Sequence, residues 1–218
     1  MISSFISFQE LFSPQYLIEY GGLTLILIIV FAETGLFFGF FLPGDSLLFT
    51  AGLLCATGVL DTSIYTLIST ICLAGIAGYF SGYLFGKKLG NNLYNKPDSL
   101  FFKKRYLYLT QDYYAKHGGY TLIIGRFLPV VRTFSPILAG VINMSFKRFV
   151  FFNISGCILW VCSMTGLGYW LGISFPGLQE YLEYIVLGLI IVTFIPVVRV
   201  FFKKKVDQTI IAETNKIL

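Results

Sequence analysis

Four charged side chains lie inside apolar segments of the chain, where they could bind an ion within a membrane. Glu33 and Asp45 belong to the first segment, and Arg126 and Arg132 belong to a later one. Guanidinium groups bind phosphate through paired hydrogen bonds, and a carboxylate can either hold a guanidinium group or take up a proton. These residue types therefore point to recognition of an oxyanion, with protons as a second partner.

The four charges are costly at the places where the sequence puts them. An ionised side chain at the centre of a bilayer costs roughly 2.5 to 3.5 kcal/mol on insertion scales. Because two acids and two bases sum to zero, we expect them to pair across the two segments inside a wet cavity. An alternative places all four in the headgroup region, at the mouths of the segments.

Glycine and proline interrupt both charged segments at matching positions. Placing Pro43 over Pro129 also aligns the glycine that lies four residues before each proline. The arms of the second segment are about ten residues long, so each would cover about 15 Å and reach only the bilayer midplane. We therefore predict two re-entrant hairpins, at about 30–60 and at 119–144. Five residues should form their tips: Gly39, Pro43, Gly44, Gly125 and Pro129.

The composition indicates the class of protein. Hydrophobic residues make up 56% of the 218 residues, charged residues make up 12%, and the mean hydropathy is +0.77. A soluble domain has about twice this charged fraction, so we predict an all-α integral membrane protein with one domain at 17–202. The four cysteines have no metal-site or disulfide-type spacing, and no nucleotide loop or catalytic triad is present. We expect no metal, no cofactor and no enzymatic activity.

Three further segments are long enough to cross the membrane completely. They are predicted at 64–86, 149–173 and 184–202. In the first of them, small residues at every fourth position predict a face for close packing: Ala74, Gly78, Gly82 and Gly86. Outside the membrane we expect an amphipathic segment at 1–16, a cytoplasmic amphipathic helix at about 98–116 and a basic tail at 203–218.

The distribution of basic residues predicts the topology. Lys and Arg are absent from the first 86 residues, and Lys116 and Lys147 flank the second hairpin. Since basic residues beside short loops stay in the cytoplasm, this hairpin should enter from the cytoplasm and return there. We expect the first hairpin to enter from the opposite side, with the C-terminus in the cytoplasm and the N-terminus outside. An additional crossing at 17–30 would reverse the placement of the N-terminus. The two halves then form an inverted repeat, which in transporters binds substrate near the midplane.

Several pieces of the sequence resemble the DedA membrane proteins, whose core is similar to that of the VTT-domain lipid scramblases. The matching pieces are Phe31 to Glu33, Phe41 to Asp45, Gly125 to Arg132, Ala139 to Met144, and Phe149 to Trp160. The resemblance covers about 25–175. Asp45 stands where many members have Glu, which shortens the side chain and keeps the charge.

This resemblance implies a fold and an activity. It implies two re-entrant hairpins that face each other, and transport of a lipid carrier, notably undecaprenyl phosphate, that depends on membrane potential or protons. It also implies that the four charged side chains are needed for activity. Asn153 and Trp160, in the last matching piece, are candidates for side chains that support them.

We therefore predict a flippase or scramblase for a phosphate-bearing lipid, either a polyprenyl phosphate or a phospholipid, in the inner membrane of a bacterium. The main alternative is a proton- or cation-coupled transporter of a small solute. A lipid phosphatase is disfavoured because His117 is the only histidine, and a scaffold would tolerate the loss of Glu33. We expect no nucleic acid as a partner, and the sequence leaves a homodimer open.

Overall fold

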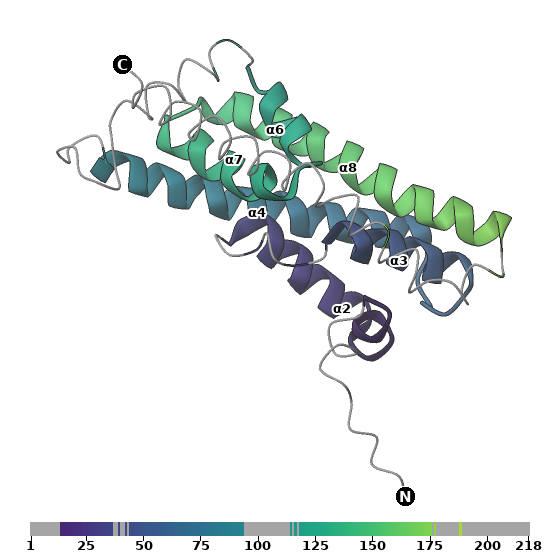
Figure 1. Cartoon of the computed structure of the whole chain (residues 1–218). Coiled ribbons are helices and arrows are strands. Elements are labelled where there is room, and N and C mark those ends of the chain that lie inside the picture. The colour runs from purple at the N-terminus through teal and green to yellow at the C-terminus, as the bar shows by residue number, and fades with distance from the viewer. Residues whose placement is uncertain are drawn as a thin grey trace, which may run out of the picture.

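The computed structural model describes residues 14–36, 44–93 and 118–175, together with the single residues 39, 42, 114, 116, 177 and 188. In this part of the chain all regular structure is helical. The helices are α2 (Pro14–Gly35), α3 (Gly44–Ala56), α4 (Ile64–Leu93), α6 (Tyr120–Gly125), α7 (Pro129–Val141) and α8 (Phe146–Ser174) (Figure 1). Pro43, the basic tail, and almost all of the segments predicted at 1–16, 98–116 and 184–202 lie outside the described residues.

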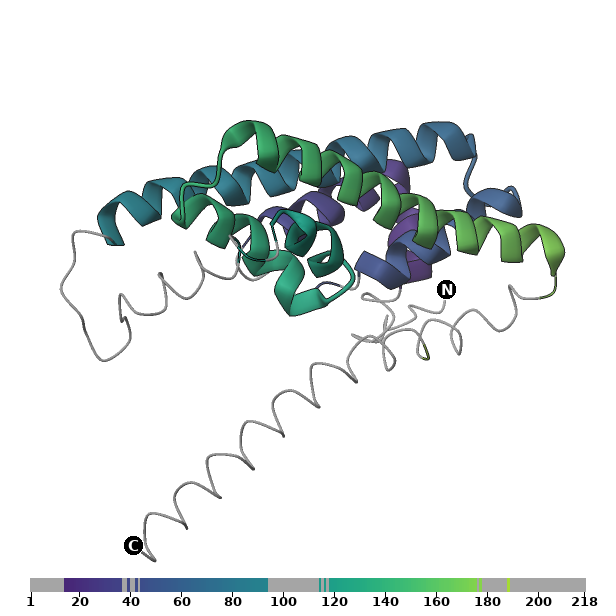
Figure 2. The ribbon, with the colours of Figure 1, turned by 90° about the horizontal axis from the view of Figure 1, so that it is seen from above.

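Two long helices form the frame of the molecule. The apolar parts of α4 and α8 comprise 27 residues (Ile64–Gly90) and 29 residues (Phe146–Ser174). At 1.5 Å per residue each is about 40 Å long, which is more than the roughly 30 Å of a bilayer's hydrocarbon core. The two helices contact each other and run in opposite directions, as both ribbon views show (Figures 1 and 2). By length and composition, each could cross a membrane.

The short helices form two pairs, and each pair bridges the frame. The chain turns back between α2 and α3, and again between α6 and α7 (Figure 2). Helix α2 packs against α4 while α3 packs along α8, and conversely α6 packs against α8 while α7 packs along α4. Each pair therefore contacts both long helices.

Glycines allow these close contacts. A Cβ atom on Gly78 would overlap α2, and one on Gly86 would overlap the backbone carbonyl of Ile137 in α7. On α8, a Cβ atom on Gly168 would likewise overlap the carbonyl of Phe49 in α3. The prediction that the small residues of the 64–86 segment form a packing face is therefore confirmed, since helix backbones can approach closely only where side chains are absent.

An aromatic cluster joins α4 to α8 at one side of the frame. The ring of Tyr83 stacks on that of Phe149 with centroids 4.2 Å apart. The Tyr83 hydroxyl donates a hydrogen bond to the carbonyl oxygen of Met144 at 2.7 Å. The ring of this tyrosine is therefore packed, and its hydroxyl has a hydrogen-bond partner.

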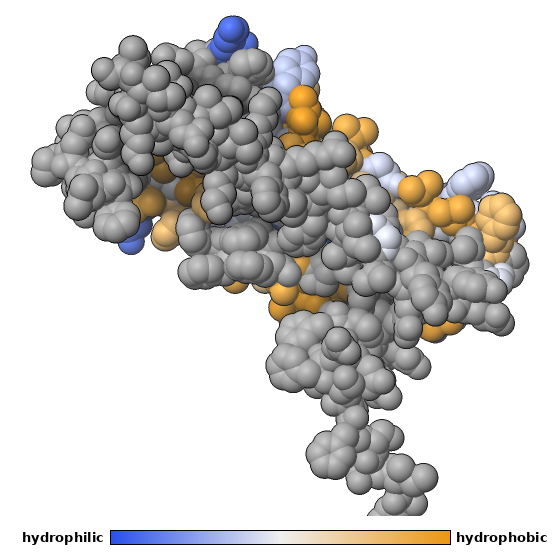
Figure 3. All heavy atoms as spheres, in the orientation of Figure 1, coloured by the Kyte–Doolittle hydropathy of each residue, from blue (hydrophilic) through white to orange (hydrophobic). Residues whose placement is uncertain are grey.

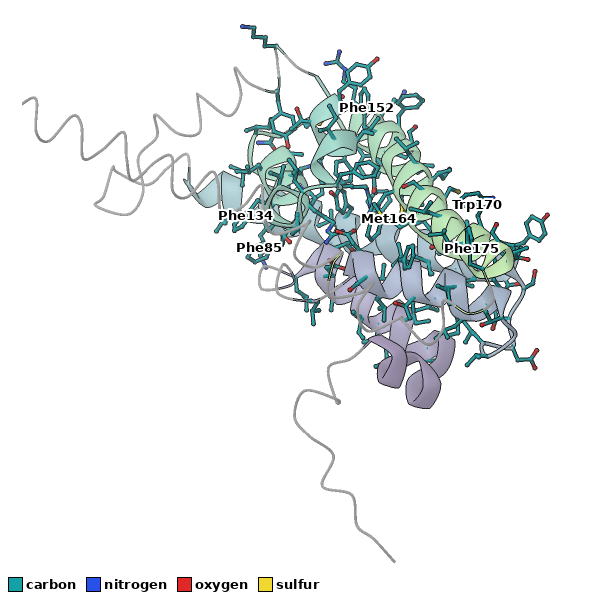
Figure 4. All side chains as sticks on the ribbon, turned by 45° about the vertical axis from the view of Figure 1, so that its right-hand side comes forward. Phe85, Phe134, Phe152, Met164, Trp170 and Phe175 are labelled. Carbon is teal, nitrogen blue, oxygen red and sulfur yellow. The ribbon has the colours of Figure 1, made fainter. Side chains whose placement is uncertain are left out.

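Apolar side chains also cover much of the outside. Phe151 and Trp170 of α8 are 65% and 60% exposed, and Figure 4 shows Trp170 and Phe175 together toward the end of α8. Most of the described surface that is visible in Figure 3 is hydrophobic. An apolar exterior around buried charges is the arrangement expected of a protein whose solvent is lipid.

Candidate functional site

Arg132 lies in the first turn of α7 and binds both predicted acids. Pro129 occupies the first position of this helix, where its missing N–H leaves no intrahelical bond unmade. The Arg132 Nη2 atom pairs with Oε1 of Glu33, and its Nη1 atom lies 2.7 Å from Oδ1 of Asp45. The exposed fractions of these three residues are at most 9%. The expected pairing between the two segments is therefore present at Arg132.

Asp45 is held from two further directions. It lies in the first turn of α3, where the positive end of the helix dipole favours a carboxylate. The Trp160 indole Nε1 donates a hydrogen bond to the same Asp45 oxygen at 2.7 Å, and its ring lies 4.9 Å from the guanidinium carbon of Arg132. The predicted supporting residue Trp160 thus joins α8 to the acid and the base.

The predicted tip glycines leave room for this network. A Cβ atom on Gly44 would overlap the carboxylate of Glu33, and one on Gly39 would overlap the backbone at the end of α2. In the other turn, a Cβ atom on Gly125 would lie only 2.8 Å from the Ser135 hydroxyl oxygen. Their role here is to allow close approach.

Arg126 has a different environment, although it follows α6 in the same turn region. It is fully buried, and in the described part of the chain it has no carboxylate partner. Its Nη2 atom donates to Oδ1 of Asn153 at 2.5 Å, and its guanidinium carbon lies 3.6 Å from the centroid of the Tyr79 ring. The Asn153 amide nitrogen is in turn 3.3 Å from the carbonyl oxygen of Ile76.

The expectation that both arginines pair with acids is therefore wrong for Arg126. The turn after α6 directs this side chain into the contact between α4 and α8, and the two acids lie on the α7 side. An amide and an aromatic face replace the carboxylate. All four charged residues are buried inside the protein.

Several buried polar atoms of the site have no hydrogen-bond partner among the described residues. They are Oε2 of Glu33, the hydroxyl of Tyr79, Nε and Nη1 of Arg126, and Nε of Arg132. Such atoms are rare in protein interiors, and each calls for an explanation. The unpartnered N–H groups of a buried guanidinium would suit an oxyanion.

Tyr79 is the residue of the site that the sequence interpretation missed. A tyrosine in an apolar span is usually a packing residue, and only its position directly after Gly78 on the close-packed face could have drawn attention to it. The described residues hold no group of three or more His, Cys, Asp or Glu side chains that could bind a metal ion.

Comparisons with known proteins agree with the resemblance. A model of the VTT domain matches residues 42–170. The chain is 38% identical over 194 residues to the protein DedA of Escherichia coli K12, covering 88% of each chain. It is 42% identical over 183 residues to an uncharacterized membrane protein of Mycobacterium leprae, covering 84% of this chain and 81% of that protein. It is 37% identical over 166 residues to the inner membrane protein YqjA of E. coli K12, covering 76% and 73%. No solved structure matches the chain.

Proposed function

The chain belongs to the DedA family of VTT-domain membrane proteins, and from this premise we propose that it moves a phosphate-bearing lipid across the bacterial inner membrane. Undecaprenyl phosphate or a related polyprenyl phosphate is the proposed substrate. The observation that carries the proposal is Arg126, a fully buried cation with two unpartnered nitrogen atoms and no carboxylate partner in the described residues. A buried cation of this kind is expensive to keep and marks a pathway for an ion.

The proposed membrane arrangement has α4 and α8 as spans and the two short pairs as re-entrant hairpins. The exchanged packing of the short helices supports this arrangement. Helix α3 of the first half packs along α8 of the second half, and α7 of the second half packs along α4 of the first half. This exchange is what two inverted repeats would produce, with the substrate site where their broken helices meet. The C-terminus is proposed to be cytoplasmic, as the basic residues indicate.

The proposed mechanism uses the two arginines in turn. Arg126 receives the phosphate group while Arg132 is held by Glu33 and Asp45. Protonation of one acid weakens that hold, since a neutral carboxyl no longer attracts the guanidinium as an ion. Arg132 can then turn to the phosphate, and two guanidinium forks bind it together. The mechanism involves transport alone, with no cofactor and no chemical change of the lipid.

A second candidate function is a proton- or cation-coupled transporter of a small solute. The unpartnered Oε2 atom of buried Glu33 favours it, because buried acids serve as proton relays in many transporters. Counterflow of a water-soluble solute, measured in liposomes that contain no polyprenyl phosphate, would support this function over lipid transport.

The proposed function is tested by translocation of labelled undecaprenyl phosphate in proteoliposomes, with and without a pH gradient. Arg126→Ala and Glu33→Ala should abolish translocation, and the gradient should increase the wild-type rate. Arg148→Ala is the matched control, since Arg148 is exposed on α8 and should leave the rate unchanged. Folded wild-type protein that moves no lipid under either condition would contradict the proposal.

A further inference from the structure

The guanidinium of Arg126 is fixed on two sides, and its other N–H groups have no hydrogen-bond partner among the described residues. Asn153 accepts a hydrogen bond from Nη2, and the ring of Tyr79 lies beneath the guanidinium plane at 3.6 Å. The Nε and Nη1 atoms are buried and have no hydrogen-bond partner at normal distance in the described part of the chain, and the Cys157 thiol is a further neighbour of the guanidinium. The group is therefore oriented before any anion arrives, which lowers the entropy cost of binding.

Tyr79 differs from the other buried tyrosines that the structure describes. Tyr83 donates its hydroxyl to the carbonyl oxygen of Met144 at 2.7 Å, and Tyr114 donates to that of Ser135 at 3.1 Å. The hydroxyl of Tyr79 is as deeply buried, yet it has no partner among the described residues. It belongs to the ring against which the guanidinium of Arg126 lies.

Charge decides which arginine an incoming anion meets first. Arg132 has two carboxyl groups on its guanidinium, so its charge is already paired. Arg126 has no carboxyl group beside it within the described ranges. An anion is therefore attracted to the side of the site where Tyr79 lies.

Resting on the proposed function, we propose that Tyr79 is a headgroup-binding residue that, together with Arg126, selects a phosphate monoester. Nε and Nη1 of Arg126 and the hydroxyl of Tyr79 supply three donors, and a monoester presents three terminal oxygens. In a diester, the form found in ordinary phospholipids, the third oxygen carries an ester substituent and no charge, which makes it a poor acceptor for the Tyr79 hydroxyl. A buried donor without an acceptor is costly, which is how such sites reject a ligand that lacks one polar atom.

Binding can be followed through the fluorescence of Trp160. Its ring centroid lies 4.9 Å from the guanidinium carbon of Arg132 and 6.0 Å from that of Arg126. The chain has only one other tryptophan, Trp170, so the full-length protein with Trp170→Phe reports from the site alone. The probes are decyl phosphate and its methyl ester, which have the same tail and differ in one capped oxygen. Each is titrated into protein in a neutral detergent, with decanol as the blank.

We expect the starting protein to bind decyl phosphate more tightly than the methyl ester. Tyr79→Phe keeps the ring under Arg126 and removes the hydroxyl, so it should weaken decyl phosphate binding roughly tenfold or more, as for loss of a hydrogen bond to a charged group. It should change binding of the methyl ester little. Tyr83→Phe is the control, because its hydroxyl is bonded elsewhere, and it should preserve the preference.

The outcomes separate this inference from the function on which it rests. If Tyr79→Phe keeps the full preference for decyl phosphate while the wild type still translocates lipid, the role of Tyr79 is wrong and the proposed function stands. If the starting protein binds neither probe and the wild type moves no lipid, both are overturned. Should Tyr79→Phe not fold, the two probes on the starting protein still decide, because equal affinity for both would contradict a three-donor site.

Discussion

Two arginines six residues apart in the sequence have opposite environments. Arg132 contacts two carboxylates and an indole ring, whereas Arg126 contacts an amide and a phenol ring and has unpartnered N–H groups in the described structure. Both are fully or almost fully buried, so exposure does not distinguish them. The difference teaches that charge pairing joins the segments on one side of the site, whereas the other side keeps a buried cation that no carboxylate of the described residues contacts.

The largest effect on stability should come from Arg132. Arg132→Ala leaves Glu33 and Asp45 buried without their cation, and breaking a buried ion pair typically costs about 3 to 5 kcal/mol. Arg126→Ala removes no ion pair from the described structure and should cost clearly less. Unfolding in detergent with increasing SDS measures both free energies, and equal losses would remove the distinction between the two sides.

A smaller effect should link Trp160 mainly to the Arg132 side of the site. The indole donates to the carboxylate of Asp45 at 2.7 Å, and hydrogen bonds to charged groups contribute about 1.5 to 3 kcal/mol. A double-mutant cycle of Trp160→Phe with Asp45→Ala should show coupling of that order. The matched cycle of Trp160→Phe with Arg126→Gln should show almost no coupling. Strong coupling in this cycle, with none in the Asp45 cycle, would assign Trp160 to Arg126 instead.

The turn beside Glu33 should tolerate no side chain. A Cβ atom at position 44 would overlap the Glu33 carboxylate, and overpacking of this kind costs about 1 to 3 kcal/mol. Gly44→Ala should therefore lower the unfolding free energy and also weaken the ion pair between Glu33 and Arg132. Gly166→Ala is the control, because nothing lies within 4 Å of its Cβ position and alanine favours a helix. A harmless Gly44→Ala would place the carboxylate elsewhere.

The smallest effect should appear at Asn153, on the Arg126 side of the site. Asn153→Ala removes the hydrogen bond that orients Arg126 and should weaken decyl phosphate binding by about 1 kcal/mol, roughly fivefold. The Arg132 ion pairs should be unaffected, so the unfolding free energy should change less than in Arg132→Ala. Ser163→Ala, on the exposed side of α8, serves as the control. An unchanged affinity would show that Tyr79 alone suffices to orient the guanidinium.

Much of the site could be predicted because its residues are charged and lie in segments that are otherwise apolar. Glu33, Asp45, Arg126 and Arg132 are conspicuous in apolar segments, and the glycine and proline positions predicted where the chain turns back. The long apolar helices and their glycine contacts followed from length and spacing in the same way. These features depend only on local sequence.

The pairing within the site could not be predicted, because it depends on where each turn directs its side chains. Charge counting suggested two pairs, but the acids both contact Arg132, and Arg126 enters the contact between α4 and α8. Tyr79 was missed because its type suits packing equally well. Whether a polar group has a partner is a property of the folded neighbourhood rather than of the sequence.

The most direct test locates the bound phosphate relative to the two arginines. Solid-state NMR can measure 31P to 15N dipolar coupling in proteoliposomes that contain a polyprenyl phosphate and protein with 15N-labelled guanidinium groups. At neutral pH we predict coupling in the wild type that persists in Arg132→Lys and disappears in Arg126→Lys. Coupling that disappears in Arg132→Lys and persists in Arg126→Lys would contradict the central claim that Arg126 receives the anion.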